Sequence, residues 1–85
     1  MNNKLEILKK RLIYRAGYRG TKEMDILLSS FVNKYINTFE ESLLIELEKF
    51  LNFEDEVILN FYNYDIVEKE IDKNKISKIF KEFKI

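Results

Sequence analysis

The chain has 85 residues, which suffices for one small domain, and it contains no cysteine and no histidine. These absences exclude a disulfide framework and a thiolate metal site, and they remove the usual general base and the commonest metal ligand. The formal net charge is zero, and the longest runs without a charged side chain, 26–33 and 57–64, are far shorter than the roughly 20 apolar residues of a membrane-spanning helix. We therefore expect one domain over residues 1–85, with no metal and no membrane insertion.

The charge is unevenly distributed along the chain. Residues 1–22 carry seven basic and one acidic side chain, residues 23–72 carry three and thirteen, and residues 73–85 carry five and one. A basic, amphipathic N-terminal segment is also typical of an organelle-targeting presequence. This stretch lacks serine and has no spacer before the features that follow, so we interpret it as the first helix of the fold.

A first helix is predicted to run to about residue 16, and a second to begin just after Thr21. The hydroxyl of Thr21 can accept from the exposed amides of the first turn. Glu23 and Asp25 lie in that turn, where the helix dipole favours negative charge. Gly17 or Gly20 is placed to end the first helix in a left-handed cap. Two apolar stripes carry the assignment: Leu5, Leu8, Leu12 and Ala16, then Met24, Leu27, Leu28, Phe31, Val32 and Tyr35.

Three further helices follow at short intervals. Thr38-Phe39-Glu40-Glu41 matches the capping-box pattern at the start of the third. Asn52 or Asp55 is expected to cap a short fourth helix, and Asp72 a fifth. The apolar stripes are Leu44, Leu47, Phe50 and Leu51 in the third helix, Ile58, Phe61 and Tyr62 in the fourth, and Ile76, Ile79, Phe80 and Phe83 in the fifth.

The segment 57–67 is the one place where a strand competes with a helix, because β-branched and aromatic residues are dense there. A single strand would have no partner elsewhere in the chain, so helix is preferred. The seven Phe and five Tyr are expected to serve mainly as bulky core anchors. The predicted fold is all-α, a compact single-domain bundle of about five short helices.

The sequence offers little support for catalysis. It has no histidine, no thiol, no glycine-rich phosphate loop and no serine with a visible base, so we predict no catalytic residue. The acidic pairs at 40–41 and 54–56 are expected to serve helix N-termini. A nucleic-acid module is an alternative raised by the basic N-terminal stretch, but the neighbouring helices are acidic and no recognition-helix pattern is present, so no nucleic-acid partner is expected.

The three arginines, Arg11, Arg15 and Arg19, all lie within residues 11–25, as do both glycines. Their spacing of four would place Arg11 and Arg15 on one helical ridge. A solvated basic face explains these two arginines as well as a local binding role does. Arg19 differs, because it precedes Gly20 at the break between two helices. We expect its guanidinium to project outward from the turn, Gly20 to allow close approach of another backbone, and Glu23 to complete a donor and acceptor pair.

Arg19-Gly20-Thr21-Lys22-Glu23 matches the RGxxE motif, and RLIYRAGYRGTKEMDILLSSF and LEKFLNFEDEVILNFY surround it. Over about residues 11–62 these segments resemble the flavinator family, the small succinate dehydrogenase assembly factors called SdhE in bacteria, with mitochondrial relatives. Two positions depart from the family pattern. Phe61 stands where a tryptophan is usual and Val57 where an aspartate is usual, and neither lies in the motif.

The resemblance implies a five-helix assembly factor, not an enzyme, that binds the flavoprotein subunit of succinate dehydrogenase, and in some bacteria that of fumarate reductase. It would promote covalent attachment of FAD to a histidine of that partner. Arg19, Gly20 and Glu23, with Asp25 as a weaker addition, would contact the partner. The chain would have no cofactor of its own, and direct FAD binding is left open. We expect a monomer in the bacterial cytoplasm; the alternative is a generic helical interaction module with another client, such as an antitoxin.

Overall fold

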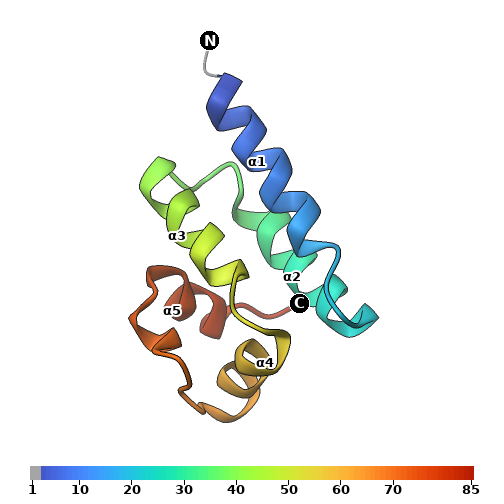
Figure 1. Cartoon of the computed structure of the whole chain (residues 1–85), viewed down its shortest axis with the longest axis vertical. Coiled ribbons are helices and arrows are strands. Elements are labelled where there is room, and N and C mark those ends of the chain that lie inside the picture. Colours follow the sequence, from blue (N-terminus) through green and yellow to red (C-terminus); the bar gives the residue numbers. More distant parts are fainter. Residues whose placement is uncertain (1–2) are drawn as a thin grey trace.

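The computed structural model describes residues 3–85, and five α-helices account for most of them (Figure 1). A single 3-10 turn, η1 (Ile71–Lys73), precedes the last helix, and residues 3–85 contain no strand. The all-α prediction of five short helices is confirmed, and so is the preference for helix over strand within 57–67. The helices are α1 (Asn3–Ala16), α2 (Lys22–Tyr35), α3 (Glu41–Leu51), α4 (Asp55–Tyr64) and α5 (Lys75–Glu82).

The helices pack in two groups that share α3. The first helix lies against both α2 and α3, while α5 lies against α3 and α4. Figure 1 shows the N-terminal end of α1 extending beyond the other helices, and the molecule measures 42 × 26 × 20 Å. This arrangement brings the turn between α1 and α2 beside the turn between α3 and α4, although the two turns are more than thirty residues apart.

An aromatic cluster joins four of the helices around Phe80, which is fully buried. Its ring centroid lies 5.1 Å from that of Phe31 on α2, 5.1 Å from that of Phe50 on α3, and 4.8 Å from that of Tyr62 on α4. Phe61 is also buried, so it fills the aromatic core position expected of it. All seven phenylalanines are buried or half-buried, as predicted, whereas Tyr14, Tyr18 and Tyr64 are exposed and take no part in the core.

The helix starts match the predictions at Thr21 and differ elsewhere. Thr21 caps α2, and its hydroxyl accepts from the Met24 amide at 3.2 Å. The predicted capping box at Thr38 is wrong, because the Thr38 hydroxyl donates to the Tyr35 carbonyl at the end of α2 and α3 begins only after Glu40. The fourth helix begins after Glu54, so neither Asn52 nor Asp55 is its cap.

Asp72 was also the wrong cap for α5. Its place is taken by Asn74, whose side-chain oxygen accepts from the Ile76 amide at 2.7 Å. The amide nitrogen of Asn74 donates to the Glu46 carbonyl on α3 at 3.0 Å. Asp72 instead lies inside η1. The residue that caps α5 is thus the one whose side chain also bonds to α3.

The first helix ends at Ala16, as predicted, but without a left-handed glycine. The Gly17 amide donates to the carbonyls of Ile13 and Tyr14, and within residues 3–85 no glycine has a positive φ. The left-handed residues are Asp65, Lys69 and Glu70, in the connection between α4 and α5. The glycines of the first turn therefore matter because they lack a side chain that would crowd nearby atoms, and not because they adopt an unusual backbone angle.

Candidate partner-binding turn

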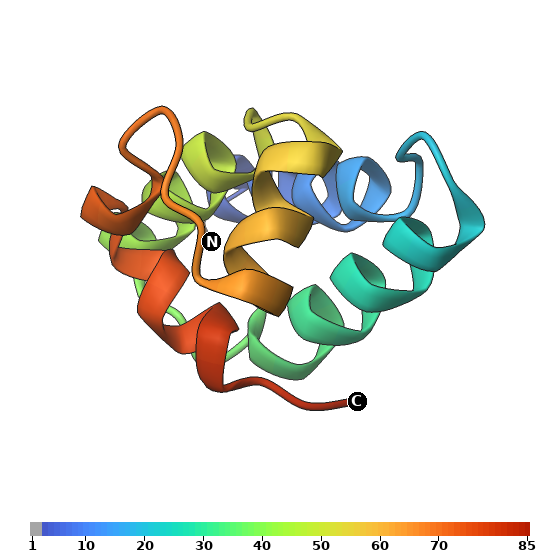
Figure 2. The same cartoon turned by 90° about the horizontal axis from the view of Figure 1, so that it is seen from below.

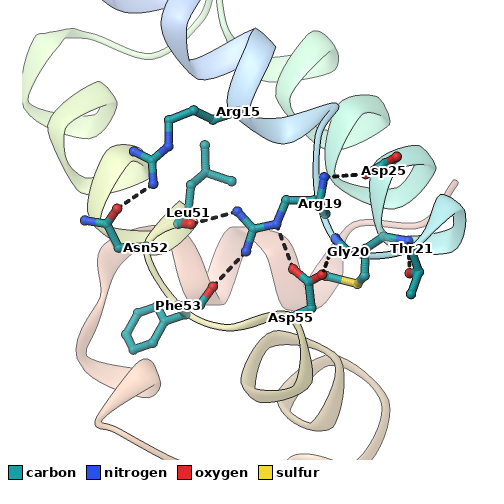
Figure 3. A network of polar contacts seen from close by, with 10 residues as sticks. Arg15, Arg19, Gly20, Thr21, Asp25, Leu51, Asn52, Phe53 and Asp55 are labelled. Carbon is teal, nitrogen blue, oxygen red and sulfur yellow. Dashed lines mark hydrogen bonds and ion pairs between the residues drawn. The ribbon is translucent and has the colours of Figure 1, made fainter.

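The three arginines line one edge of α1 and of the turn that follows it, and each pairs with α3 or with residues that follow α3. Figure 3 shows Arg15 and Arg19 with their partners. Arg11 pairs with Glu48 at 2.7 Å, and Arg15 donates to the side-chain oxygen of Asn52. The interpretation of Arg11 and Arg15 as a purely solvated ridge is therefore wrong. Arg11 is exposed to solvent and Arg15 is half-buried, and together they connect α1 to α3 and to the residue that follows it.

Arg19 lies at the inner end of this row, and its side chain is only 10% exposed. Its Nε donates to Asp55 Oδ1 at 2.7 Å, its Nη1 to the Leu51 carbonyl at 2.7 Å, and its Nη2 to the Phe53 carbonyl at 2.7 Å. Figure 3 shows the guanidinium reaching from the first turn to the turn between α3 and α4. The expected outward projection of this side chain is therefore wrong: it turns into the molecule.

These partners suit a guanidinium for an electrostatic reason. The carbonyls at the C-terminal end of a helix lack intrahelical donors and carry the negative end of its dipole, and α3 ends at Leu51. Asp55 stands in the first turn of α4, where the opposite pole favours a carboxylate. One planar cation therefore satisfies the end of one helix and the acid that begins the next, which a lysine ammonium could not do in the same plane.

The backbone of the turn is held from two sides. The Arg19 amide donates to Asp25 Oδ1 at 2.5 Å, and the Gly20 amide donates to Asp55 Oδ2 at 2.9 Å. A Cβ at Gly20 would lie 3.2 Å from the same Asp55 oxygen. The Asp55 carboxylate thus approaches Gly20 more closely than a side chain there would ordinarily allow, and its two oxygens hold both residues of the Arg19-Gly20 pair.

The outer side of the turn presents Gly20, Thr21, Lys22 and Glu23, all of them exposed. The Glu23 carboxylate makes no hydrogen bond or ion pair with any residue in 3–85. Asp25 is only half-buried, yet its carboxylate is engaged by the Arg19 amide. The structure therefore brings the four predicted residues together and divides them: Arg19 and Asp25 shape the turn, whereas Gly20 and Glu23 lie on its surface.

Asp55 is the part of this site that the sequence did not reveal. Its position near the start of a helix predicts only a cap, and its contacts with Arg19 and Gly20 span 36 and 35 residues. An acid at the start of a helix is commonplace, so nothing local marks it. Only the packing of the two turns shows its role.

Next to Asp55, Glu54 takes a different direction. Its carboxylate accepts from Lys69, and this hydrogen bond lowers the pKa of Glu54 and raises the pKa of Lys69 from their ordinary values. Both side chains are largely exposed. The pair ties the α4–α5 connection to the start of α4 without entering the Arg19 network.

Within residues 3–85 no group of three or more carboxylates is arranged to hold a metal ion. No helix among these residues is long and apolar enough to cross a membrane.

Curated relatives of the chain share one description. The chain is 43% identical over 79 residues to the protein named succinate dehydrogenase assembly factor 2, mitochondrial, of Scheffersomyces stipitis, and 37% identical over 79 residues to the protein of the same name in Debaryomyces hansenii. Each match covers 91% of this chain, but 52% and 55% of the respective relative. The Danio rerio protein of that name is 44% identical over 48 residues, which is 56% of this chain and 30% of the relative. The chain thus spans about half the length of the first two relatives.

The family described as "Flavinator of succinate dehydrogenase" matches residues 10–84. This range is longer than the resemblance over residues 11–62, and it takes in α5. It includes Asp55 and all of residues 17–25, which comprise the turn after α1 and the first residues of α2 and are called the Arg19 turn below. The chain belongs to the flavinator of succinate dehydrogenase family.

Proposed function

We propose that the chain is an assembly factor that binds the flavoprotein subunit of succinate dehydrogenase and promotes covalent attachment of FAD to it. Membership of the flavinator family supports this function, and so do the names of the yeast relatives. The observation that carries the proposal is the Arg19 turn, in which a buried arginine network fixes the backbone. Gly20 and Glu23 are exposed on this turn, and the Glu23 carboxylate has no partner within residues 3–85.

In this proposal the chain acts by binding and not by catalysis. The turn docks on the flavoprotein and holds the domains of that partner in place. The flavin methyl group and the acceptor histidine of the partner then stay within reach of each other. The bond then forms by the chemistry of the flavin itself, and this chain needs no cofactor. A rigid docking turn suits this role, because contacts that need no ordering on binding waste less binding free energy.

The partner-contacting residues in the proposal are Gly20 and Glu23 directly, with Arg19 and Asp25 acting through the shape of the turn. Gly20 lets a partner backbone approach an exposed surface that has no side chain, and Glu23 accepts from partner donors. The same turn would serve the fumarate reductase flavoprotein where the host has one. The bacterial cytoplasm stays a prediction, as does a monomeric free state; the named relatives are mitochondrial.

The test measures covalent flavin directly. The host's apo-flavoprotein is incubated with FAD, with and without the chain, and flavin fluorescence is read in a denaturing gel over time. We expect the wild-type chain to accelerate the appearance of covalent flavin and Gly20→Arg, which crowds both Asp55 and the exposed turn, to abolish the acceleration.

Asn33→Arg is the control, because it places the same arginine side chain, with the same added charge, at an exposed position on α2 remote from the turn. Both variants are first compared with the wild type by thermal unfolding. Equal rates of covalent flavin formation with and without the wild-type chain contradict the proposed function. A folded Gly20→Arg variant that works as well as the wild type contradicts the role of the turn.

A further inference from the structure

A groove of about 330 Å³ opens beside the Arg19 turn, between α2 and α4. Ile26 and Leu27 of α2 line one side, Leu59 of α4 lines the other, and Ile85 at the C-terminus adds a third wall. Ile26 is 49% exposed and Ile85 is 78% exposed. The groove is therefore an apolar surface that the described chain leaves open to solvent.

The third wall is held in place by the C-terminal tail, which runs alongside α2 (Figure 2). Phe83 is buried, with its ring centroid 5.3 Å from that of Phe31 and 6.4 Å from that of Tyr35. The Tyr62 hydroxyl donates to the Phe83 carbonyl at 2.5 Å. Because the tail is anchored two residues before Ile85, the groove is a formed feature of the fold.

One charged side chain, that of Glu23, lines this groove. Glu23 and Ile26 are three residues apart on α2 and so lie on the same face, which joins the groove to the exposed side of the Arg19 turn. Since Glu23 has no partner within residues 3–85, its charge is available to a cation from outside. The groove thus offers apolar walls and one charged side chain, which lies at the end nearest the turn.

We propose that this groove receives an apolar side chain of the flavoprotein partner, and that a neighbouring lysine or arginine of the partner pairs with Glu23. The inference rests on the proposed function and deepens it, because it extends the docking surface from the turn to the groove. Apolar anchors that fill pockets at the centre of an interface carry much of the binding free energy. FAD is a poor occupant, because its phosphates would meet the Glu23 carboxylate and the groove offers no cation.

The test is a titration of the host's apo-flavoprotein with the purified chain. Ile26→Asp is expected to weaken binding by at least about tenfold, because it places a charge on the apolar wall. Ile45→Asp is the matched control, because Ile45 is a similarly exposed isoleucine, at 43%, on α3 and outside this groove. Ile85→Ser removes the third wall without touching a buried residue and is expected to weaken binding in the same direction.

Glu23→Gln tests the charge, with Glu41→Gln as its control, since both glutamates are exposed and stand in the first turn of a helix. We expect Glu23→Gln to weaken binding and to flatten its dependence on salt, and Glu41→Gln to do neither. Binding by Ile26→Asp and Ile85→Ser that equals binding by Ile45→Asp overturns the groove as a docking site. So does a wild-type chain that self-associates and loses this self-association in Ile26→Asp, because a second copy would then be the occupant.

The outcome is distinguishable from failure of the proposed function. If the wild-type chain accelerates covalent flavin formation and Ile26→Asp accelerates it equally, the function stands and the groove inference is wrong. If the wild-type chain neither binds the flavoprotein nor accelerates flavin attachment, the proposed function fails before the groove is tested.

Discussion

Arg19 serves two turns at once, which explains why an arginine stands there in a chain that otherwise relies on lysine. Its three donors point to a carboxylate, to the carbonyl of Leu51 at the end of α3, and to the carbonyl of Phe53 in the turn that follows. A planar fork meets three acceptors in fixed directions, whereas an ammonium would meet them as a point charge. The cluster of arginines in the sequence therefore reflects contacts within the chain, and the surface offered to a partner lies on the other side of the same turn.

The importance of Asp55 can be measured by Asp55→Asn. The substitution keeps the size of the side chain but leaves a largely buried guanidinium without its carboxylate, so we expect it to lower the free energy of unfolding by about 1–3 kcal/mol. Chemical denaturation provides the measurement. The control is Glu48→Gln, which breaks the exposed pair with Arg11 and should cost about 0–1 kcal/mol. Equal losses in the two variants would contradict the special role of the Arg19 pair.

Local signals predicted Arg19 and Glu23 as a donor and acceptor pair on one turn, but Arg19 pairs with Asp55 and Glu23 has no partner within residues 3–85. The orientation of Arg19 was beyond such signals, because every acceptor of its guanidinium lies at least 32 residues away. A turn residue with no visible local partner looks like a residue that faces solvent. Here the long-range packing of two turns reverses that expectation.

At the scale of the helix, apolar periodicity and helix ends differ in how well they can be predicted. The apolar stripes of all five helices are buried or half-buried as expected, because each stripe follows from the helical repeat alone. The N-cap residues are harder to predict, because several polar residues near the start of each helix could act as the cap. Asn74 caps α5 in place of Asp72, and its bond to the Glu46 carbonyl of α3 is a contact that no local pattern contains.

The corrected caps give a direct test in the pair Thr21→Ala and Thr38→Ala. Thr21 accepts from the Met24 amide at the start of α2, so its loss should cost about 1 kcal/mol. Thr38 is exposed and begins no helix, so its loss should fall within about 0.5 kcal/mol. Urea denaturation of both variants compares them with the wild type. A larger loss of unfolding free energy in Thr38→Ala than in Thr21→Ala would contradict this assignment and would favour the capping box at Thr38.

The contact between α3 and α5 should also depend on pH through Glu46. The Lys75 amide donates to the Glu46 carboxylate at 3.2 Å and, with a smaller contribution from Lys49, lowers the pKa of Glu46 below its ordinary value of 4.5. A lowered folded-state pKa means that the stabilisation is present above pH 4.5 and is lost as the pH falls through the folded-state pKa.

The measurement compares the free energy of unfolding of the wild type with that of Glu46→Gln across the acid range. We expect the wild type to be the more stable at neutral pH and the difference to shrink below pH 4.5. A difference that stays constant, or that grows as the pH falls, would show that the Glu46 charge does not stabilise the start of α5.

At the scale of the whole molecule, aromatic packing replaces the disulfide or metal that small domains often use. Phe80 contacts rings from α2, α3 and α4, so the core depends on one residue of a helix only eight residues long. This core supports the two adjoining turns and the tail that forms the groove. The fold could be predicted from periodicity, whereas the joining of turns and tail into one surface follows only from how the helices pack.

Phe80→Ala tests this dependence. Truncating a fully buried phenylalanine removes its contacts with three helices and leaves a cavity, so we expect a loss of about 3–5 kcal/mol in the free energy of unfolding. The control is Tyr64→Ala, which removes an aromatic ring that is 69% exposed and should change stability by no more than about 0.5 kcal/mol. Similar losses in the two variants would mean that the aromatic cluster is not the centre of the core.

The central claim is that this chain binds a flavoprotein through the surface of the Arg19 turn. It is tested most directly by titrating the host's apo-succinate dehydrogenase flavoprotein with the wild-type chain, with Gly20→Arg and with Asn33→Arg, and comparing the dissociation constants. We predict saturable binding by the wild type, equal binding by Asn33→Arg, and binding at least about tenfold weaker by Gly20→Arg. No binding by the wild type, or equal binding by all three folded proteins, would contradict the claim.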